Sequence, residues 1–291
     1  MRQRTGLFCA KKTLFMLLTL LYLNGCMSVG KKQTIDPRLE TDRLAKAHGF
    51  QKIPIQTNPF LLTSYQKRNS NGKEIAIYIE GDGRTWISRH QLSNDPTPRQ
   101  PLALKLAFQD RSPMVAYLAR PCQYTPIATE PACDARIWSN LRFSERVVAA
   151  MNEAITALKN TAQADKIHLI GFSGGGAIAV LIADRRNDIA TLRTVAGDLD
   201  PTRLSEYHHT TPLTGSLNPS DAIPRLIDLP QYHFSGEKDT IVPPFIAQTF
   251  VLRLNQQGSH CAKYKIIPKA THHEGIESIW STLLQLPVTC L

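Results

Sequence analysis

The sequence predicts an α/β protein with a mostly parallel central sheet of about eight strands flanked by helices. Short apolar runs, typical of buried strands, alternate with longer segments of helical periodicity, and this alternation favours parallel strands joined by helical crossovers. The 291 residues are 42% hydrophobic, with glycine and proline not in excess. This composition indicates a globular chain, and the length suits one large domain.

The eight expected strands share apolar or alternating residues bounded by turn signals. They lie at 49–57, 59–67, 74–79, 114–119, 166–171, 189–195, 231–235 and 264–267. Residues 69–72, Asn-Ser-Asn-Gly, predict a hairpin turn between the second and third of these strands. This opening hairpin would give the sheet an antiparallel edge.

Helices are expected where apolar residues recur at helical spacing. They lie at 102–109, 143–159, 177–183, 243–255 and 275–286. Residues 197–229 show little periodicity and are too polar for a core element and too long for a simple connection. We therefore expect them to form a small cap over the functional site.

A strand, an abrupt turn and an apolar helix meet at residues 166–183. Within the turn, Gly171, Ser173 and Gly175 form G-x-S-x-G, the pattern of a nucleophile elbow. The glycines are needed because a Cβ at either position would collide with the neighbouring strand or helix. The helix N-terminus behind the serine offers unpaired backbone N–H groups to a developing negative charge. Neither a dinucleotide fingerprint nor a P-loop matches this spacing.

A serine hydroxyl becomes a good nucleophile only when a base removes its proton and a third group orients that base. Asp239 follows a late strand and precedes Val-Pro-Pro, which begins a helix. His272 and His273 follow the last strand, where an imidazole on a loop can reach the serine. Only one of two adjacent histidines can point inward, and we expect it to be His272, with His273 as the alternative.

With serine, acid and histidine in this order, the chain from about residue 50 to its C-terminus resembles the α/β-hydrolase superfamily. The resemblance implies that Ser173 is the nucleophile and that His272 is first the general base and then the general acid. It implies that Asp239 orients the histidine. Asp198 and Asp200 are the alternatives for this acid, since some hydrolases take it one strand earlier.

The same resemblance implies an oxyanion hole. Its first donor would be the backbone N–H of Gly174, directly after the nucleophile. Residues 80–82, Glu-Gly-Asp, match the family's His-Gly-x with glutamate in place of histidine, so the backbone N–H of Asp82 would be the second donor. We predict neither a cofactor nor a metal site.

The N-terminus predicts a signal peptide over residues 1–25. A basic start is followed by an apolar run at 13–23, about half of the ~20 residues that a spanning helix needs. The run leads into Leu-Asn-Gly-Cys, which resembles the lipobox of bacterial lipoproteins and implies cleavage before Cys26 and acylation of its thiol. Met27 implies outer-membrane sorting in that family. The alternatives are an ordinary signal peptide with an incidental cysteine and an uncleaved anchor.

Residues 26–48 are polar and charged, so we expect a tether, followed by the hydrolase domain over 49–291. The formal charge of +10 falls to +6 without the signal, since 30 basic residues then face 24 acidic ones. The basic residues are scattered and no nucleic-acid-binding motif is present, so a nucleic-acid partner is not expected. The oligomeric state stays open.

Four further cysteines, an even number in an exported chain, favour disulfides. Nearness in sequence favours the pairs Cys122–Cys133 and Cys261–Cys290 among the three possible pairings. Zinc is disfavoured because no Cys-x-x-Cys spacing occurs.

The sequence as a whole therefore predicts a lipid-anchored serine hydrolase of the bacterial envelope. It would cleave an ester, or less commonly a thioester or amide, through an acyl-enzyme. No large apolar insertion resembles a lipase lid, which favours a small or medium soluble ester. The alternative is a catalytically silent lipoprotein that keeps the scaffold to bind a ligand or an envelope component.

Overall fold

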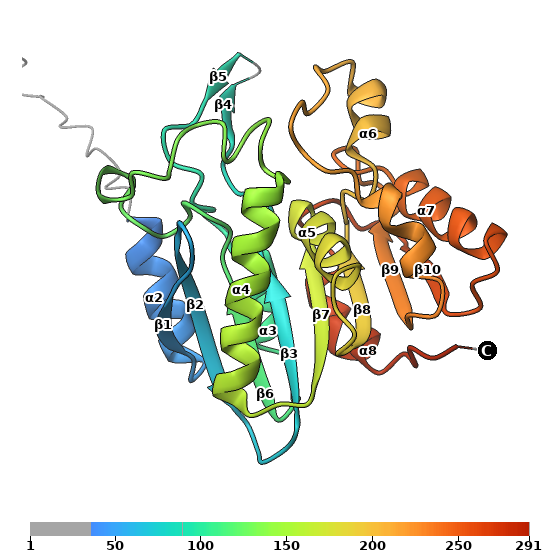
Figure 1. The fold of residues 1–291 in the computed structure, drawn as a ribbon, viewed down its shortest axis with the longest axis horizontal. Coiled ribbons are helices and arrows are strands. Elements are labelled where there is room, and N and C mark those ends of the chain that lie inside the picture. Colours follow the sequence, from blue (N-terminus) through green and yellow to red (C-terminus); the bar gives the residue numbers. More distant parts are fainter. Residues whose placement is uncertain (1–35, 89, 291) are drawn as a thin grey trace, which may run out of the picture. The chain divides into compact units, whose positions relative to one another are not determined.

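The computed structural model describes residues 36–88 and 90–290. At its centre lies an eight-stranded sheet in the order β1-β2-β6-β3-β7-β8-β9-β10 (Figure 1). The β1–β2 and β2–β6 pairs are antiparallel, and the remaining pairs are parallel. This arrangement confirms the predicted mostly parallel sheet.

The central strands at 74–79 and 114–118 are apolar and buried along nearly their whole length, as expected where helices cover both faces of a sheet. The strands are β1 (Gln51–Gln56), β2 (Leu61–Arg68), β3 (Glu74–Ile79), β6 (Met114–Leu118), β7 (Lys166–Phe172), β8 (Ile189–Val195), β9 (Gln231–Gly236) and β10 (Ala262–Ile267). A separate two-stranded hairpin is formed by β4 (Trp86–Ser88) and β5 (Gln91–Leu92).

The prediction that the turn at residues 69–72 joins two paired strands is wrong. The turn does join β2 to β3, but β6 lies between them and pairs with both. An Asn-Gly turn reverses the chain locally but does not determine which strands pair. Every residue of β6 is buried, which fits a position inside the sheet, between β2 and β3. The antiparallel edge is instead formed by β1 and β2.

Two helical layers sandwich the sheet. The buried residues of α4, α5 and α7 belong to the core on one face, and those of α2, α3 and α8 to the core on the other. The helices are α2 (Pro37–Ala47), α3 (Leu102–Ala107), α4 (Glu145–Ala162), α5 (Gly174–Ala183), α6 (Pro201–His208), α7 (Phe245–Gln256) and α8 (Trp280–Leu284), with 3₁₀ turns at Ile127–Thr129, Pro219–Arg225 and Glu277–Ile279. The predicted helices thus form, although 275–286 is divided between a 3₁₀ turn and α8.

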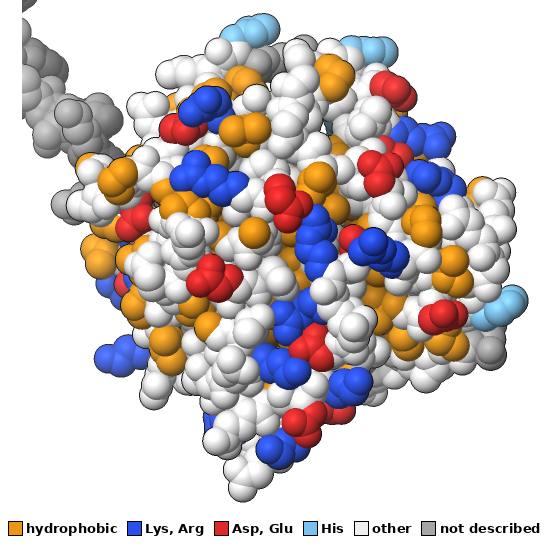
Figure 2. Space-filling view, in the orientation of Figure 1, with side chains coloured by type: hydrophobic (Ala, Val, Ile, Leu, Met, Phe, Trp, Pro, Cys, Tyr) orange, Lys and Arg blue, Asp and Glu red, His pale blue; other side chains and the backbone are white. Residues whose placement is uncertain are grey.

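Basic and acidic side chains are interspersed on the face shown in Figure 2. This pattern agrees with the scattered basic residues of the sequence. Across residues 36–88 and 90–290, no helix is both long and apolar enough to cross a membrane.

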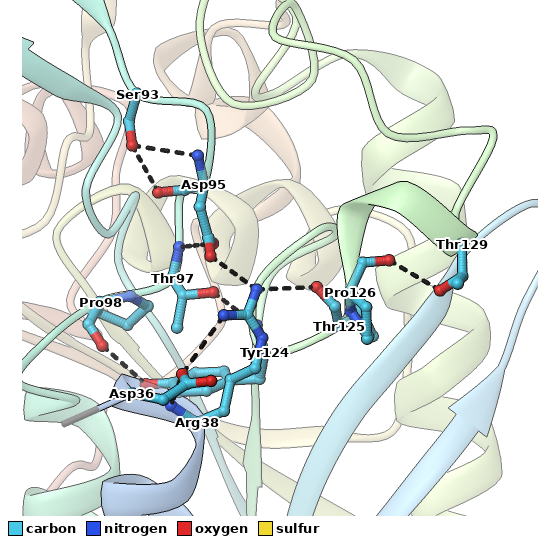
Figure 3. Close-up of polar contacts among 10 residues, drawn as sticks. All are labelled: Asp36, Arg38, Ser93, Asp95, Thr97, Pro98, Tyr124, Thr125, Pro126 and Thr129. Atoms are coloured by element: carbon cyan, nitrogen blue, oxygen red, sulfur yellow. Dashed lines mark hydrogen bonds and ion pairs between the residues drawn. The ribbon is translucent and has the colours of Figure 1, made fainter.

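The compact domain begins at Asp36 and not at residue 49, so the tether expected over 26–48 is wrong for its last part. Helix α2 packs on the domain through the buried Thr41 and Ala45. Arg38 donates to the Asp95 carboxylate at 2.6 Å and to the Thr125 carbonyl at 3.2 Å (Figure 3). The segment is polar because only one side of α2 is buried. The predicted signal peptide and Cys26 lie outside the described residues.

Both expected cysteine pairs are bonded. Cys122–Cys133, hereafter the loop disulfide, closes the segment that follows β6. Cys261–Cys290, the C-terminal disulfide, joins the start of β10 to the chain end.

Candidate active site

The predicted elbow lies between β7 and α5. Ser173 has φ +51° and ψ −122°, a conformation that non-glycine residues rarely adopt. A Cβ on Gly171 would lie 2.3 Å from the Gly175 carbonyl oxygen, and one on Gly175 would lie 2.3 Å from the Ile79 carbonyl oxygen. Glycine is therefore required at both positions, because the turn brings strand, helix and neighbouring strand into backbone contact.

Ser173, Asp239 and His272 converge from the carboxyl ends of β7, β9 and β10. His272 Nε2 lies 3.0 Å from Ser173 Oγ, and its Nδ1 lies 2.8 Å from Asp239 Oδ2. The other carboxylate oxygen of Asp239 accepts the N–H groups of Ile241 and Val242 at 2.9 and 2.8 Å. With its proton on Nδ1 facing the carboxylate, the imidazole leaves Nε2 free to accept the serine proton.

The alternative residues lie elsewhere. His273 is exposed and lines the cavity, and the hydrogen bond recorded for the Ser173 hydroxyl is with His272. Asp198 is buried 3.7 Å from Arg142 Nη2, and burial raises its pKa to about 7. Asp200 caps α6 by accepting the Arg203 N–H at 3.1 Å. The geometry therefore joins His272 to Asp239 and to neither alternative acid.

The two expected oxyanion donors lie beside the elbow. A Cβ on Gly81 would come 3.2 Å from Ser173 Cβ, so the loop after β3 passes next to the serine. Within the part of the chain that the structure describes, neither the N–H of Gly174 nor that of Asp82 donates to a protein acceptor. Neither N–H group is therefore occupied by another group of the described residues.

The Asp82 side chain also lies at this position. A Cβ on Gly174 would fall 2.0 Å from Asp82 Oδ1, which places a carboxylate directly beside the expected oxyanion hole. Arg120 Nη1 lies 3.2 Å from this carboxylate and Arg142 Nε lies 3.1 Å from it. The two guanidinium groups offset the negative charge that would otherwise oppose an oxyanion.

Sequence reasoning missed these two arginines. Arg120 is buried, and the loss of hydration lowers its pKa to about 10. Arg142 bridges Asp82 and Asp198, and Asp198 follows β8. The four charged residues come from four distant segments, and no local spacing relates them.

A cavity of about 1660 Å³ lies over Ser173. Residues 201–214 form part of its wall, so the segment expected to be a cap does border the site. The β4–β5 hairpin also contributes to the wall, with Trp86 51% and Ile87 46% exposed, and so does Ile241 at 48%. These side chains give the cavity exposed apolar surface. The hairpin was missed because its strands span only three and two residues.

In the part of the chain that the structure describes, no group of three or more His, Cys, Asp or Glu side chains is arranged to hold a metal ion. The reactive groups that the described residues bring together here are the serine, the histidine and the surrounding hydrogen-bond donors.

The chain resembles solved structures in its fold. No family model matches the chain, and no curated protein sequence matches it. Among solved structures, an esterase of Pyrococcus furiosus is 14% identical, with 82% of this chain and 92% of that one covered and a TM-score of 0.59. Est1E of Butyrivibrio proteoclasticus is 14% identical, with 80% and 96% covered and a TM-score of 0.56. An α/β serine hydrolase homologue of Coxiella burnetii is 18% identical, with 81% and 94% covered and a TM-score of 0.50.

The sheet, the helical layers and these structural similarities define the α/β-hydrolase fold. The identities are too low to carry an activity to this chain, so its function must be inferred from the site.

Proposed function

We propose that this protein is a serine hydrolase that cleaves esters through an acyl-enzyme. The observation that carries the proposal is the continuous chain of contacts from Ser173 Oγ through both nitrogens of His272 to the buried carboxylate of Asp239. This arrangement has the geometry that general-base activation of a serine requires.

In the proposed reaction, Ser173 Oγ attacks the ester carbonyl carbon while His272 Nε2 accepts the serine proton. The carbonyl oxygen becomes an oxyanion and accepts hydrogen bonds from the N–H groups of Gly174 and Asp82. One such donor contributes roughly 2.7–4 kcal/mol to lowering the barrier. His272 then gives the proton to the departing alkoxide, and the acyl group stays on Ser173 as an ester.

Water completes the cycle by the same route. His272 Nε2 accepts a proton from water as its oxygen attacks the acyl carbon, and returns that proton to Ser173 as the acid departs. Throughout, the carboxylate of Asp239 keeps the imidazole oriented and stabilises its positive charge. The chain's own residues thus supply nucleophile, base and acid.

Two observations favour an ester over a thioester or amide. The cavity has exposed apolar surface that suits an acyl or alkyl group of small or medium size. Structures of similar fold include an esterase and an esterase domain, although an acylaminoacyl peptidase and a puromycin hydrolase are also among them.

Labelling with a fluorophosphonate probe tests the proposal, with Ser173→Ala as the matched control. We expect the wild-type protein alone to be labelled, and also to hydrolyse short p-nitrophenyl esters. Equal labelling of both proteins would refute the assignment of Ser173. An unlabelled wild type with no ester turnover, together with saturable binding of an envelope component, would favour the catalytically silent alternative.

We also propose that the protein is anchored in the bacterial envelope through an acylated Cys26, as the lipobox-like sequence implies. Incorporation of labelled palmitate into the wild type but not into Cys26→Ser would support the anchor. Equal incorporation into both would refute it.

A further inference from the structure

The segment after β6 contains an unusual stretch of backbone. Cys122 has φ +71° and Tyr124 has φ +62°, and Gln123 lies between them with 1% of its surface exposed. Non-glycine residues in the left-handed region are destabilised and persist only where the surroundings impose the conformation, often at functional sites. Two such residues on either side of one buried polar side chain indicate that the segment holds this side chain in a particular place.

The amide of Gln123 is oriented by two backbone groups. Its Oε1 accepts the Arg120 N–H at 3.0 Å, and its Nε2 donates to the Gly81 carbonyl at 2.9 Å. A backbone N–H can only donate, so the oxygen of the amide must face Arg120 and the nitrogen must face Gly81. Gln123 therefore connects the loop after β6 to the loop after β3.

The hydrogen bond to Gly81 determines how the next peptide unit lies. In a trans peptide, the Gly81 carbonyl and the Asp82 N–H point in opposite directions. Because Gln123 holds the carbonyl, the Asp82 N–H lies on the opposite side of that peptide unit. The Gly81 N–H is held as well, since it donates to Glu80 Oε1 at 2.9 Å. Both polar backbone groups of Gly81 are thus bound by buried side chains.

The segment that carries Gln123 is itself well anchored. The Tyr124 N–H donates to Thr97 Oγ1 at 2.9 Å, and the Thr125 carbonyl accepts from Arg38 (Figure 3). The loop disulfide joins the residue before Gln123 to the far end of the loop. These contacts can keep the left-handed residues in place and limit the movement of the amide.

From this geometry we propose that Gln123 is a positioning residue: it holds the Gly81–Asp82 peptide so that the Asp82 N–H serves as the second oxyanion donor. The inference rests on the proposed hydrolase function. The oxyanion exists only in the transition state and the tetrahedral intermediate. Loss of the Gln123 restraint therefore lowers kcat and leaves KM nearly unchanged.

Gln123→Met tests this role, because methionine has a similar length and volume but no donor. In the full chain we expect kcat for p-nitrophenyl butyrate to fall roughly 10- to 100-fold, somewhat less than for loss of a whole donor, with KM within about twofold of wild type. Gln231→Met is the matched control. Gln231 is also buried and its Nε2 donates to the Leu226 and Leu229 carbonyls, but it lies at the amino end of β9, whereas Ser173 follows the carboxyl end of the parallel strand β7. We expect Gln231→Met to lower Tm and to keep kcat within about twofold of wild type.

Gln123→Glu gives a second readout that a purely structural role would not produce. A glutamic acid can donate to the Gly81 carbonyl only while it is protonated. We therefore expect the ratio of its kcat to that of the wild type to rise as the pH falls, whereas the same ratio for Gln123→Met stays flat.

The possible results separate this inference from the proposed function. A wild-type protein without fluorophosphonate labelling or ester turnover would refute the proposed function itself. If the wild type is active, three results would overturn the role of Gln123 without affecting the proposed function. They are a wild-type kcat in Gln123→Met, a raised KM in Gln123→Met without a lower kcat, and a loss of kcat in Gln231→Met as large as that in Gln123→Met. A pH-independent ratio for Gln123→Glu would also count against it.

Discussion

Replacing Asp239 by asparagine is expected to remove most of the activity without disturbing the fold. In Asp239→Asn, the side-chain oxygen can still accept the N–H groups of Ile241 and Val242, as Asp239 Oδ1 does at 2.9 and 2.8 Å. The new amide nitrogen then faces His272 Nδ1, where Asp239 Oδ2 lies at 2.8 Å. Two donors cannot share this contact, so the imidazole must take the tautomer with its proton on Nε2, which cannot accept from Ser173.

The size of the effect follows from the lost charge. Asp239 is buried, and the centres of its carboxylate and of a protonated imidazole would lie about 4 Å apart. At an effective dielectric constant of about 20, two unit charges at about 4 Å attract by about 4 kcal/mol. A loss of about 4 kcal/mol from the transition state lowers kcat about 10³-fold, and the unfavourable tautomer adds to this loss.

Steady-state hydrolysis of p-nitrophenyl butyrate measures the change, and Asp200→Asn is the matched control. Asparagine also caps helices, so α6 keeps its N-terminal hydrogen bond and kcat stays near that of the wild type. Asp200→Asn also tests one alternative acid, and Asp198→Asn tests the other. A loss of less than tenfold in Asp239→Asn, or a larger loss in Asp198→Asn, would refute the assignment of Asp239.

Three other outcomes are expected. Burial raises the pKa of Glu80 from its usual 4.5 to about 7. The folded protein therefore keeps this proton up to a higher pH than the unfolded chain does, and the stability that the bound proton contributes is lost as the pH rises from 4.5 through 7. In urea unfolding, the free energy of unfolding of Glu80→Gln should therefore rise relative to that of the wild type by up to about 3 kcal/mol between pH 4.5 and pH 8. A difference between the two proteins that does not change with pH would contradict the burial argument. Replacing the two cysteines of the loop disulfide by serine should lower the free energy of unfolding by about 3 kcal/mol. The same replacement in the C-terminal disulfide should lower it by about 4 kcal/mol, because that disulfide closes a longer loop. Only removal of the loop disulfide should lower kcat, because this disulfide anchors the segment that carries Gln123. Equal losses of kcat on removal of either disulfide would argue against that role. In a series of p-nitrophenyl esters, Trp86→Ala should weaken any preference for longer acyl chains. Leu252→Ala, which replaces an exposed residue of α7, should leave that preference unchanged. The same dependence of activity on acyl length in both variants would exclude Trp86 from acyl binding.

The predicted site residues that the structure brings together are those with a local signal in the sequence. Ser173 lies within a short glycine pattern, and Asp239 and His272 each follow a strand that is recognisable from its apolar run. Parallel strands bring their carboxyl ends to one edge of a sheet, so three local signals were enough to place these side chains together.

The parts of the site that depend on distant contacts had no such signal. Gln123 and Arg142 look like ordinary loop residues in the sequence. The contacts that bring them to the site, with Gly81 for Gln123 and with Asp82 and Asp198 for Arg142, join residues 42 to 60 positions apart. The pairing of β6 between β2 and β3 was missed for the same reason, since local turn residues do not determine which strands become neighbours. Helix α2 was taken for a tether because its buried surface is narrow.

The central claim is that Ser173 carries an acyl group during turnover. The most direct measurement is a rapid-mix assay with p-nitrophenyl butyrate, followed by acid quenching and mass analysis of the peptides. We expect a burst of p-nitrophenolate close to one equivalent per protein, and a butyryl group on the peptide that contains Ser173. Steady turnover in which the acyl group is found on another residue, or turnover that survives in Ser173→Ala, would contradict the mechanism.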